Sequence, residues 1–555
     1  MKNKKSIVSL LFVYGLSHAM LIIITGQWWD DWCLWTNDVT GILEMFTEAG
    51  FPWQIIDTLF AMAFPRWGYR IVVFFLFLLT GLLFYMVLRR LDYLSEEDAF
   101  WMAAIAMTVP VNDARATLIC YSYSLDLSLF MLAFYIATRL KDISGWKKYV
   151  MRVFCLCCML YSYATESLLI FTGLIWLYLF CVVLKENKRE KLKSKIGVFF
   201  CKYWDFFITP FVFYIVKSTF FKPYGRYEHY NNVTWKALIK GILLSPVSSL
   251  KTVALIGRSY LCQISVLSLI VYVAAVVIYF LVRRDRSAKK KEEDFPNRKK
   301  QIIVFSFGTI VFFAGIFAYV VVRGGGAIES TGVSGRDAML AGFGIGIMVV
   351  AFLRVLPVKK TLQNLIAIFL VLLGIFHFND WYLNYQEDWY YQQEFAKAIL
   401  DNGGFADDNT ILCDFTMASP NGGTRFYSLN GMSYIATGKM DKFFFSGIED
   451  LNYGLQFNKD FLNGYNADDY DYSDRTIDGV LLVNNAPISN SGLLKIRLHE
   501  AFALDAYKED VCSITDYSYI RIPNEISDRI YELYCNNELT SDVLRELVAF
   551  HELKK

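Results

Sequence analysis

The sequence predicts a polytopic α-helical membrane protein with a smaller extracytoplasmic α/β or α+β domain at its C-terminal end. Three observations lead to this fold class: an apolar composition, recurring long apolar runs, and a change in charge near residue 380. Of 555 residues, 55% are hydrophobic, 17% are aromatic and only 19% are charged. This is too apolar for an ordinary soluble chain, and it excludes disordered, collagen-like and coiled-coil proteins.

The net charge of +2 hides two parts of opposite sign. Residues 1–379 hold 41 Lys and Arg against 24 Asp and Glu, a net of +17, and residues 380–555 hold 14 against 29, a net of −15. We therefore divide the chain into a transmembrane domain, 1–379, and a polar domain, 380–555. Neither part has the charge pattern or motifs of a nucleic-acid-binding protein, so no nucleic-acid partner is expected.

A helix needs about 20 apolar residues to cross the hydrocarbon core of a bilayer. Runs of this kind predict about eleven membrane-spanning helices, although two runs are short and an even count stays open. The predicted spans are 7–25, 71–88, 100–119, 124–138, 150–164, 167–184, 198–217, 262–282, 302–322, 338–353 and 361–378.

The loops predict the orientation independently, because Lys and Arg near membrane spans are retained on the cytoplasmic side. With the N-terminus inside, the cytoplasmic segments hold 29 of the 41 basic residues, and the other loops, longer in sum, hold 12. This predicts an N-in, C-out multi-pass protein of the cell (inner or plasma) membrane. The first span follows MKNKK and lacks a small-x-small cleavage pattern, so we expect it to remain as an anchor.

After residue 380 the sequence pattern changes to short periodic segments broken by Gly, Asn and Asp. No P-loop, dinucleotide fingerprint, EF-hand loop or nucleophile elbow occurs there. The stretch 441–475 predicts loops. The predicted helices are 384–400 and 525–536, and the predicted strands are 409–415, 479–485 and 517–523.

The first outside loop begins with the motif WWDDW, in which Asp30 and Asp31 are adjacent at the end of the first predicted span. An aromatic interface belt around a helix-capping Asp is the structural interpretation. The functional interpretation is a carboxylate that accepts a proton from an incoming nucleophile, or binds a cation, at the membrane surface. Adjacent carboxylates repel each other, and this favours a bound proton, metal or ligand.

The rest of this loop reads TGILEMFTEAG and PWQIIDTLFAMAF. Both segments predict short amphipathic helices that lie on the bilayer, with Glu44, Glu48 or Asp57 on the polar face.

These features together resemble the GT-C superfamily of polytopic glycosyltransferases, in particular the Gtr type that decorates O antigen and other cell surface polysaccharides. The resemblance covers residues 1–379. It implies inverting, hexosyltransferase-type transfer of a sugar from a polyprenyl-phosphate donor to an extracytoplasmic glycan or lipid-linked acceptor. It also implies that Asp30 or Asp31 is the catalytic base. The chain departs from the Asp-Asp-x-x-Arg form common in the Gtr type, because it reads DDWCLW.

A lipid-phosphate donor also needs cations outside the membrane. Arg336, in the glycine-rich loop 323–344, resembles the phosphate-contacting Arg of GT-C enzymes and suits bidentate pairing with a phosphodiester. The structural alternative is an ion pair between Arg336 and its neighbour Asp337.

The loop 220–235 alternates cations with tyrosines, which suits phosphate binding and sugar stacking but equally suits a membrane interface. Its predicted donor phosphate-binding residues are Lys222 and Arg226. Secondary candidates on the outside loops are Asp113, Arg115, Glu166 and His229.

Two other functions stay open. A polysaccharide polymerase or ligase also acts outside on lipid-linked sugars, although such proteins usually depend on a large outside loop with paired arginines. A non-enzymatic lipid-linked sugar transporter places polar or broken-helix elements at mid-membrane and often shows internal repeats. The predicted spans of this chain contain few charges, and its two halves show no visible repeat.

Paired carboxylates without histidines suit Mg²⁺ or Mn²⁺ and equally suit no metal, so no cofactor is assigned.

Overall fold

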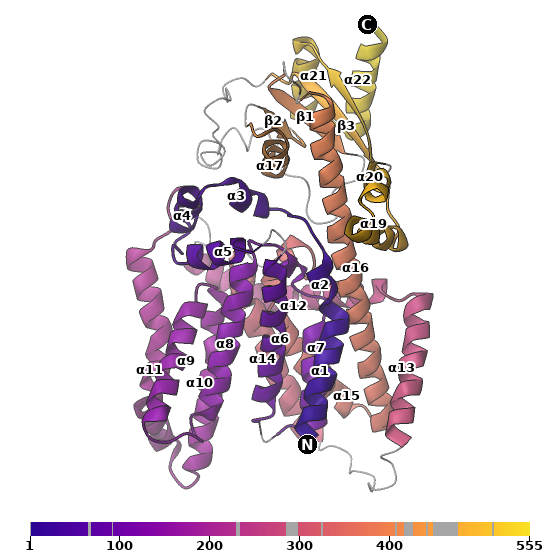
Figure 1. Cartoon of the computed structure of the whole chain (residues 1–555). Helices are drawn as coiled ribbons and strands as arrows, with labels where there is room; N and C mark the ends of the chain where they lie inside the picture. Colours follow the sequence, from indigo (N-terminus) through magenta and orange to yellow (C-terminus); the bar gives the residue numbers. More distant parts are fainter. Residues whose placement is uncertain are drawn as a thin grey trace. The chain divides into compact units, whose positions relative to one another are not determined.

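The structure is a computed structural model of the chain. It describes residues 2–64, 68–91, 93–228, 234–284, 298–323, 326–403, 405, 408–415, 426–439, 442–447, 476–512 and 515–554. The chain forms two compact units, and each is described by itself (Figure 1). Unit 1 comprises Met1–Ile23, Glu48–Ala116 and Cys120–Trp381, and unit 2 comprises Ile24–Thr47, Thr117–Ile119 and Tyr382–Lys555.

Unit 1 is a bundle of α-helices joined by loops and 3-10 helices (Figure 1). Its α-helices are α1 (Lys2–His18), α2 (Met20–Ile23), α5 (Gln54–Met62), α6 (Tyr69–Leu88), α7 (Glu96–Thr108), α8 (Tyr121–Arg139), α9 (Trp146–Ser162), α10 (Ser167–Glu186), α11 (Leu192–Phe220), α12 (Trp235–Cys262), α13 (Val266–Arg284), α14 (Arg298–Val322), α15 (Ala341–Val355) and the first part of α16 (Lys360–Asp401). Its loops contain the 3-10 helices η1 (Asp113–Ala116), η2 (Gly225–Tyr227) and η4 (Val333–Ala338).

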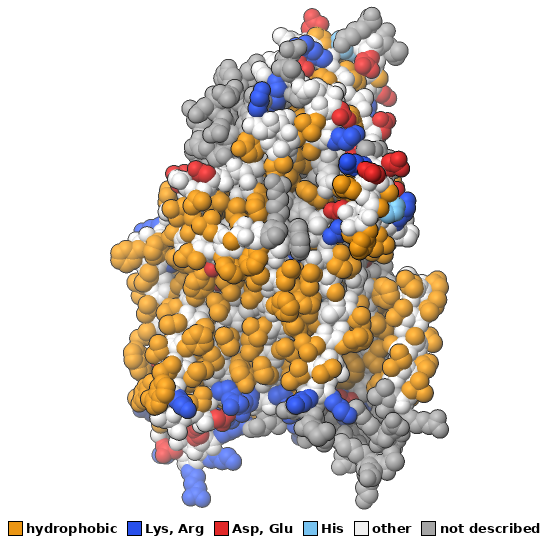
Figure 2. All heavy atoms as spheres, viewed as in Figure 1, with side chains coloured by type: hydrophobic (Ala, Val, Ile, Leu, Met, Phe, Trp, Pro, Cys, Tyr) orange, Lys and Arg blue, Asp and Glu red, His pale blue; other side chains and the backbone are white. Residues whose placement is uncertain are grey.

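The chain is a polytopic helical membrane protein. Six helices of the described chain are long and apolar enough to cross a bilayer, namely α6, α10, α11, α12, α14 and α16, and two apolar helices are shorter, Val266–Leu281 and Ala341–Val355. Hydrophobic side chains cover the visible outer face of the bundle (Figure 2). The predicted number of about eleven spans stays a prediction.

The 28-residue helix α12 was not among the predicted spans. Its Gly241 packs on Val321 at the end of α14. Its Thr252, eleven positions later, accepts a hydrogen bond from the backbone N–H of Ile328, in the loop beyond α14. Eleven residues of a helix cover about 16 Å, so Gly241 and Thr252 are well separated along α12. Their partners Val321 and Ile328 both lie near the same end of α14, which indicates that α12 passes across this end of α14 and does not run alongside it.

Glycines let α14 and α15 approach closely. A Cβ atom at Gly344 of α15 would overlap the backbone of Phe312 in α14, and one at Gly308 of α14 would lie 2.9 Å from the backbone N of Met348. Small residues at a helix interface are the usual means by which membrane helices pack backbone to backbone. This packing fixes both ends of the loop that carries η4.

Unit 2 contains a four-stranded mixed sheet in the order β2-β1-β3-β4. β1 runs parallel to β2 and β3, and β4 is antiparallel to β3. The strands are β1 (Thr410–Phe415), β2 (Phe443–Phe445), β3 (Gly479–Asn485) and β4 (Thr515–Arg521). The helices are α3 (Asp31–Thr36), α4 (Val39–Glu48), the end of α16, α17 (Phe426–Thr437), α19 (Asn490–Phe502), α20 (Leu504–Cys512), α21 (Asn524–Cys535) and α22 (Ser541–Lys554).

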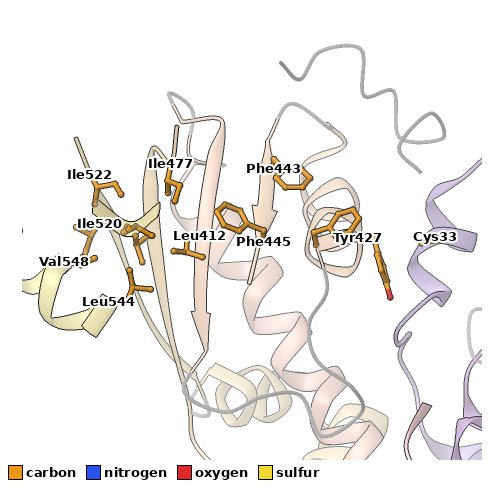
Figure 3. Close-up of a cluster of buried hydrophobic side chains, with 13 residues drawn as sticks. Cys33, Leu412, Tyr427, Phe443, Phe445, Ile477, Ile520, Ile522, Leu544 and Val548 are labelled. Atoms are coloured by element: carbon orange, nitrogen blue, oxygen red, sulfur yellow. The ribbon is translucent and has the colours of Figure 1, made fainter. Parts of the chain in front are cut away.

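Helices cover both faces of this sheet, because successive side chains along a strand point to opposite faces. Ile411 and Leu481 belong to one core, which also contains Ile399 of α16. Leu412 belongs to the other core, which includes Val548 of α22 (Figure 3). Unit 2 is therefore a three-layer α/β fold.

The start of the first loop contributes to both cores of unit 2. Trp32 is buried in one core and Cys33 in the other, and Cys33 is labelled at the edge of its cluster in Figure 3. Residues 24–47 were predicted to belong to the domain 1–379, whereas the structure places them in unit 2. The reason is that the Trp-rich segment buries its side chains against α16 and α17 instead of displaying them.

Candidate functional site

The two adjacent carboxylates of the first loop lie in unit 2 and differ in environment. Asp31 is fully buried at the start of α3. One of its oxygens accepts a hydrogen bond from the backbone N–H of Ile119 at 3.0 Å, and the other accepts one from that of Trp28 at 3.4 Å. A carboxylate that binds two backbone N–H groups fixes loops in place, so the contacts of Asp31 favour the structural interpretation for this residue.

Asp30 is only half-buried. Its Oδ1 accepts a hydrogen bond of 2.9 Å from the Tyr427 hydroxyl of α17. The residue before it, Trp29, has a φ of 55°, a left-handed conformation that costs a non-glycine residue about 1–3 kcal/mol. The strained turn directs Asp30 toward α17. Of the two acids, Asp30 is the one with an accessible carboxylate and a phenol that can orient it.

A second polar group forms in unit 1, where η1 and η4 pack together. The backbone N–H of Asn112 donates to the carbonyl of Ser330 and joins the two loops. Asp113 is fully buried, and its Oδ1 lies 3.3 Å from Nε2 of His377 in α16. Its Oδ2 is buried and makes no hydrogen bond within the described part of the chain. The His377 ring stacks on Trp381 at an interplanar angle of 14°.

Beside this pair, Asp337 lies between two guanidinium groups. It forms an ion pair with Arg323, and its Oδ1 is 3.8 Å from Nε of Arg336. Burial raises the pKa of Asp337, whereas the charges of Arg336 and Arg323 lower it. Arg336 also donates to the carbonyl of Val333. The carboxylate of Glu329 also interacts with Asp337, so this cluster contains two guanidinium groups and two carboxylates.

The structure brings the loops of three predicted residues together, because Asp113 and Arg115 lie in η1 and Arg336 lies in η4. The remaining predicted residues of unit 1 belong to other segments of that unit. Lys222 is exposed in the loop after α11, and the backbone of Arg226 forms part of η2. The Arg226 side chain and the whole of His229 lie outside the described residues.

Arg115 and Glu166 have structural partners. Arg115 is buried, donates to the backbone carbonyls of Asn112 and Val111, and lies 4.4 Å from the ring centre of Phe77. These contacts brace η1.

Glu166 forms an ion pair with Lys217 of α11. The Lys217 ammonium lies 3.6 Å from the ring centre of Phe51, a cation–π contact. This pair links the start of α10 to α11 and to the segment before α5.

A third group of polar side chains contains Asp57 and Asp126, and the sequence did not indicate that these two acids lie close together. Asp57 of α5 is 6% exposed and accepts a hydrogen bond of 2.5 Å from the Tyr161 hydroxyl of α9. Asp126 of α8 is 0% exposed and accepts one of 2.8 Å from the Thr165 hydroxyl. The carboxylates of Asp57 and Asp126 interact electrostatically. Burial raises the pKa of Asp57 despite the Tyr161 hydrogen bond, which lowers it.

One oxygen of each of these two acids, Oδ2 of Asp57 and Oδ1 of Asp126, is buried without a hydrogen-bond partner among the described residues. Buried acceptors normally have partners, so two such oxygens in one place mark a candidate site for a proton or a ligand. The sequence shows both acids, but their proximity depends on how α5 packs on α8. No group of three or more His, Cys, Asp or Glu side chains suited to a metal occurs in the part of the chain that is described.

Asp30 and Asp31 belong to unit 2, whereas Arg336, Lys222 and Arg226 belong to unit 1. Any cooperation between these acids and cations is a relation between the two units, and it stays a prediction.

Comparison with known proteins gives little. No protein-family model matches the chain. No curated protein matches it either. Among solved structures, ArnT from Cupriavidus metallidurans, crystallised in the apo state, is 11% identical. The match covers 89% of this chain and 95% of that chain with a TM-score of 0.30. A likeness this weak establishes neither a shared fold nor a shared activity.

Proposed function

We propose that this protein is a membrane glycosyltransferase that moves a sugar from a polyprenyl-phosphate donor to an extracytoplasmic glycan or lipid-linked acceptor. The observation that carries the proposal is the pair Asp57 and Asp126. Each acid keeps a buried oxygen without a partner in the described chain, and both lie where the short helix α5 packs on α8. A reaction on a lipid-linked substrate needs a proton acceptor at this kind of place, where a membrane bundle meets an interfacial helix.

The proposed reaction is one displacement. An acceptor hydroxyl attacks the anomeric carbon, its proton passes to a carboxylate, and the bond from that carbon to the phosphate oxygen breaks. The products are the glycosylated acceptor, with inverted configuration, and the polyprenyl phosphate. Asp30 is the first candidate for the base and Asp31 the second, as the resemblance implies. Asp57 is a competing candidate, because burial raises its pKa and so makes its carboxylate a stronger base.

The departing phosphate requires cations. Arg336 is proposed to bind it, because Arg336 and Arg323 both lie against Asp337 and a guanidinium group suits bidentate pairing with a phosphate. Lys222 and Arg226 are proposed as further phosphate contacts.

The proposed orientation is N-in and C-out in the cell membrane. Figure 2 shows Lys and Arg side chains gathered at the end of the bundle at which the N-terminus lies. An excess of basic residues at that end supports a cytoplasmic location for it.

The test is a transfer assay with purified protein in detergent and a radiolabelled polyprenyl-phosphate sugar, run with EDTA and again after Mg²⁺ or Mn²⁺ is restored. We expect Asp30→Asn or Asp57→Asn to lower kcat by about 10²-fold or more, as loss of a general base does. Glu44→Gln on α4, at an exposed acid, is the control and should transfer normally.

The products separate the alternatives. Addition of one sugar supports a transferase, whereas extended chains indicate a polymerase or ligase. Wild-type rates for the Asp30→Asn, Asp31→Asn and Asp57→Asn proteins would refute the assignment of the base. Failure of the native protein to transfer sugar in detergent, together with movement of lipid-linked sugar across sealed vesicles, would indicate a transporter.

A further inference from the structure

The helix pair α19–α20 of unit 2 displays a continuous apolar surface. Leu494, Leu498 and Phe502 follow one another at intervals of four residues, so they form one stripe along α19. Their exposed fractions are 46%, 59% and 87%, and Leu504 at the start of α20 is 59% exposed. We call these four residues the apolar stripe.

The opposite side of α19 is buried within unit 2. Leu493 and Ile496 are 1% and 4% exposed, so this side packs into unit 2. The apolar stripe is therefore a second apolar face, which folding of the described part of unit 2 does not bury. Neighbouring exposed apolar side chains of this size mark a protein-binding or membrane-binding surface.

Hydrogen bonds fix α19 beside the two points at which the chain enters unit 2. Glu500 of α19 accepts from the Thr25 hydroxyl at 3.4 Å and from the Tyr390 hydroxyl of α16 at 3.2 Å. Gln386 of α16 in turn accepts from the backbone N–H of Thr25 at 2.7 Å. The chain enters unit 2 at Ile24 and at Tyr382.

The first entry point lies at the end of the apolar run 7–25, and the second follows the run 361–378; both runs are predicted to cross the membrane. Within unit 2, α19 is thus hydrogen-bonded to residues at or soon after the ends of these two predicted spans. The charges around the apolar stripe nearly balance, because Lys495 pairs with Asp510 and Arg497 pairs with Glu500. An apolar face without a strong net charge fits lipid acyl chains better than a charged protein surface.

We propose that α19 and α20 lie in the outer headgroup layer of the bilayer, with Leu498, Phe502 and Leu504 inserted among the acyl chains. The pair docks unit 2 on the membrane. This inference does not depend on the transfer reaction, because it requires only that the runs 7–25 and 361–378 of this membrane protein cross the bilayer.

The test compares two phenylalanines of unit 2 in the full-length protein. A genetically encoded, environment-sensitive fluorescent amino acid replaces Phe502 in one protein and Phe550 in another. Phe550 of α22 is 58% exposed and serves as the matched control. Each protein is reconstituted into phosphatidylcholine vesicles, with and without brominated acyl chains that quench nearby fluorophores.

We expect at least threefold stronger quenching at position 502 than at 550, a blue-shifted emission at 502, and no change in 1 M NaCl. Equal quenching at both positions would overturn the proposal. A signal at 502 that ignores bromine but changes as the protein-to-lipid ratio rises would also overturn it, because a second copy of the chain would then cover the apolar stripe.

A second measurement does not rely on a fluorophore. In vesicles, the double variant Leu498→Ser, Phe502→Ser should exchange the backbone amide hydrogens of α19 at least tenfold faster than the wild type. Phe550→Ser should leave this exchange unchanged. The substituted side chains are exposed in unit 2, so its cores remain intact. Equal exchange in the wild type and the double variant would contradict insertion of α19.

Discussion

At the scale of single residues, the acids of the candidate sites differ in what they cost the fold. Both carboxylate oxygens of Asp31 accept hydrogen bonds from backbone N–H groups. Asp57 and Asp126, in contrast, each bury one oxygen that has no hydrogen-bond partner in the described chain. An unsatisfied buried acceptor costs about 1–3 kcal/mol. Proteins often keep destabilising groups of this kind at functional sites. Asp57 and Asp126 are therefore candidates for a functional role, as Asp30 is, and all three should be tested by mutation.

Replacement of Asp57 by Asn should stabilise the protein at high pH. Burial raises the pKa of Asp57, so the folded chain holds this proton more tightly than the unfolded chain. Below the pKa of Asp57 in the unfolded chain, its carboxyl group is protonated in both states and does not destabilise the fold. As the pH rises from that pKa to the raised pKa of the folded chain, the free energy of unfolding falls. Asp57→Asn should gain about 1 kcal/mol at pH 8, with a higher midpoint of thermal unfolding in detergent and a gain that shrinks toward pH 4.

Glu44→Gln, at an exposed carboxylate, is the control for that measurement. It should leave the midpoint unchanged at both pH values. A lower midpoint for Asp57→Asn at pH 8 would show that the charged form of Asp57 is well satisfied.

Asp31→Ala should lower stability more than Asp30→Ala. The first change strands the N–H groups of Ile119 and Trp28, at about 1–3 kcal/mol, and the second removes the hydrogen bond from Tyr427, worth about 1 kcal/mol. Denaturant unfolding followed by tryptophan fluorescence measures both. Asp30→Ala and Tyr427→Phe should also be non-additive, because they remove the same bond. If Asp31→Ala unfolds at the wild-type midpoint, the structural role assigned to Asp31 is incorrect.

At the scale of elements, the close approach of α14 and α15 makes a strong prediction. Gly344→Ala places a methyl group on the backbone of Phe312 and should force the two helices apart. Overpacking of this kind costs about 1–3 kcal/mol. The loop with η4 joins these helices, so the phosphate binding that we propose for Arg336 should weaken too. Thermal unfolding in detergent checks the first effect, and the KM for the lipid donor checks the second.

Gly173→Ala in α10 is the matched control, because nothing lies within 4 Å of the added methyl group. It should be neutral or stabilise by about 0.5–1 kcal/mol, since Ala favours helix more than Gly does. A Gly344→Ala protein as stable as the Gly173→Ala protein would mean that the two helices can separate without cost.

Elements with a strong local pattern were predictable. The predicted spans 71–88 and 167–184 coincide with α6 and α10, and the predicted strand 479–485 has the bounds of β3. α12 was not predicted, because it carries four basic residues and a proline in its interior, which a search for uncharged runs rejects. β2 has three residues, too few for an alternating pattern to appear.

The candidate site was predictable only in part, for a physical reason. Asp113 and Arg336 were recognised singly, because charges beside membrane spans are rare. Asp57 and Tyr161 are 104 residues apart, and no local pattern predicts their hydrogen bond. The contacts of Asp31 with Ile119 depend on tertiary packing in the same way.

At the scale of the whole molecule, unit 2 is assembled from three separate segments of the chain. Its cores contain Trp32 and Cys33 from the first loop together with Phe395 and residues that follow it. A chain that ends after Trp381 should therefore leave residues 24–47 without their partners.

Limited proteolysis tests this dependence. In the shortened chain, cleavage between residues 24 and 47 should be at least about tenfold faster than in the full chain, because local opening then costs little. Cleavage in the loop between α10 and α11, within unit 1, should be unchanged and serves as the control. Equal rates at residues 24–47 would mean that this loop folds without the C-terminal segment.

The three-segment composition of unit 2 also bears on how the protein is made. Cys33 leaves the ribosome early, whereas Val548, a member of the same core, is synthesised about 500 residues later. At about 5–20 residues per second, the interval is on the order of a minute. During that time the cores of unit 2 are incomplete and cannot bury Trp28, Trp29 and Trp32. We expect these side chains to lie at the membrane interface meanwhile, because tryptophan is favoured there. We therefore expect the first loop to reach its final packing only after the C-terminal segment of unit 2 has been made.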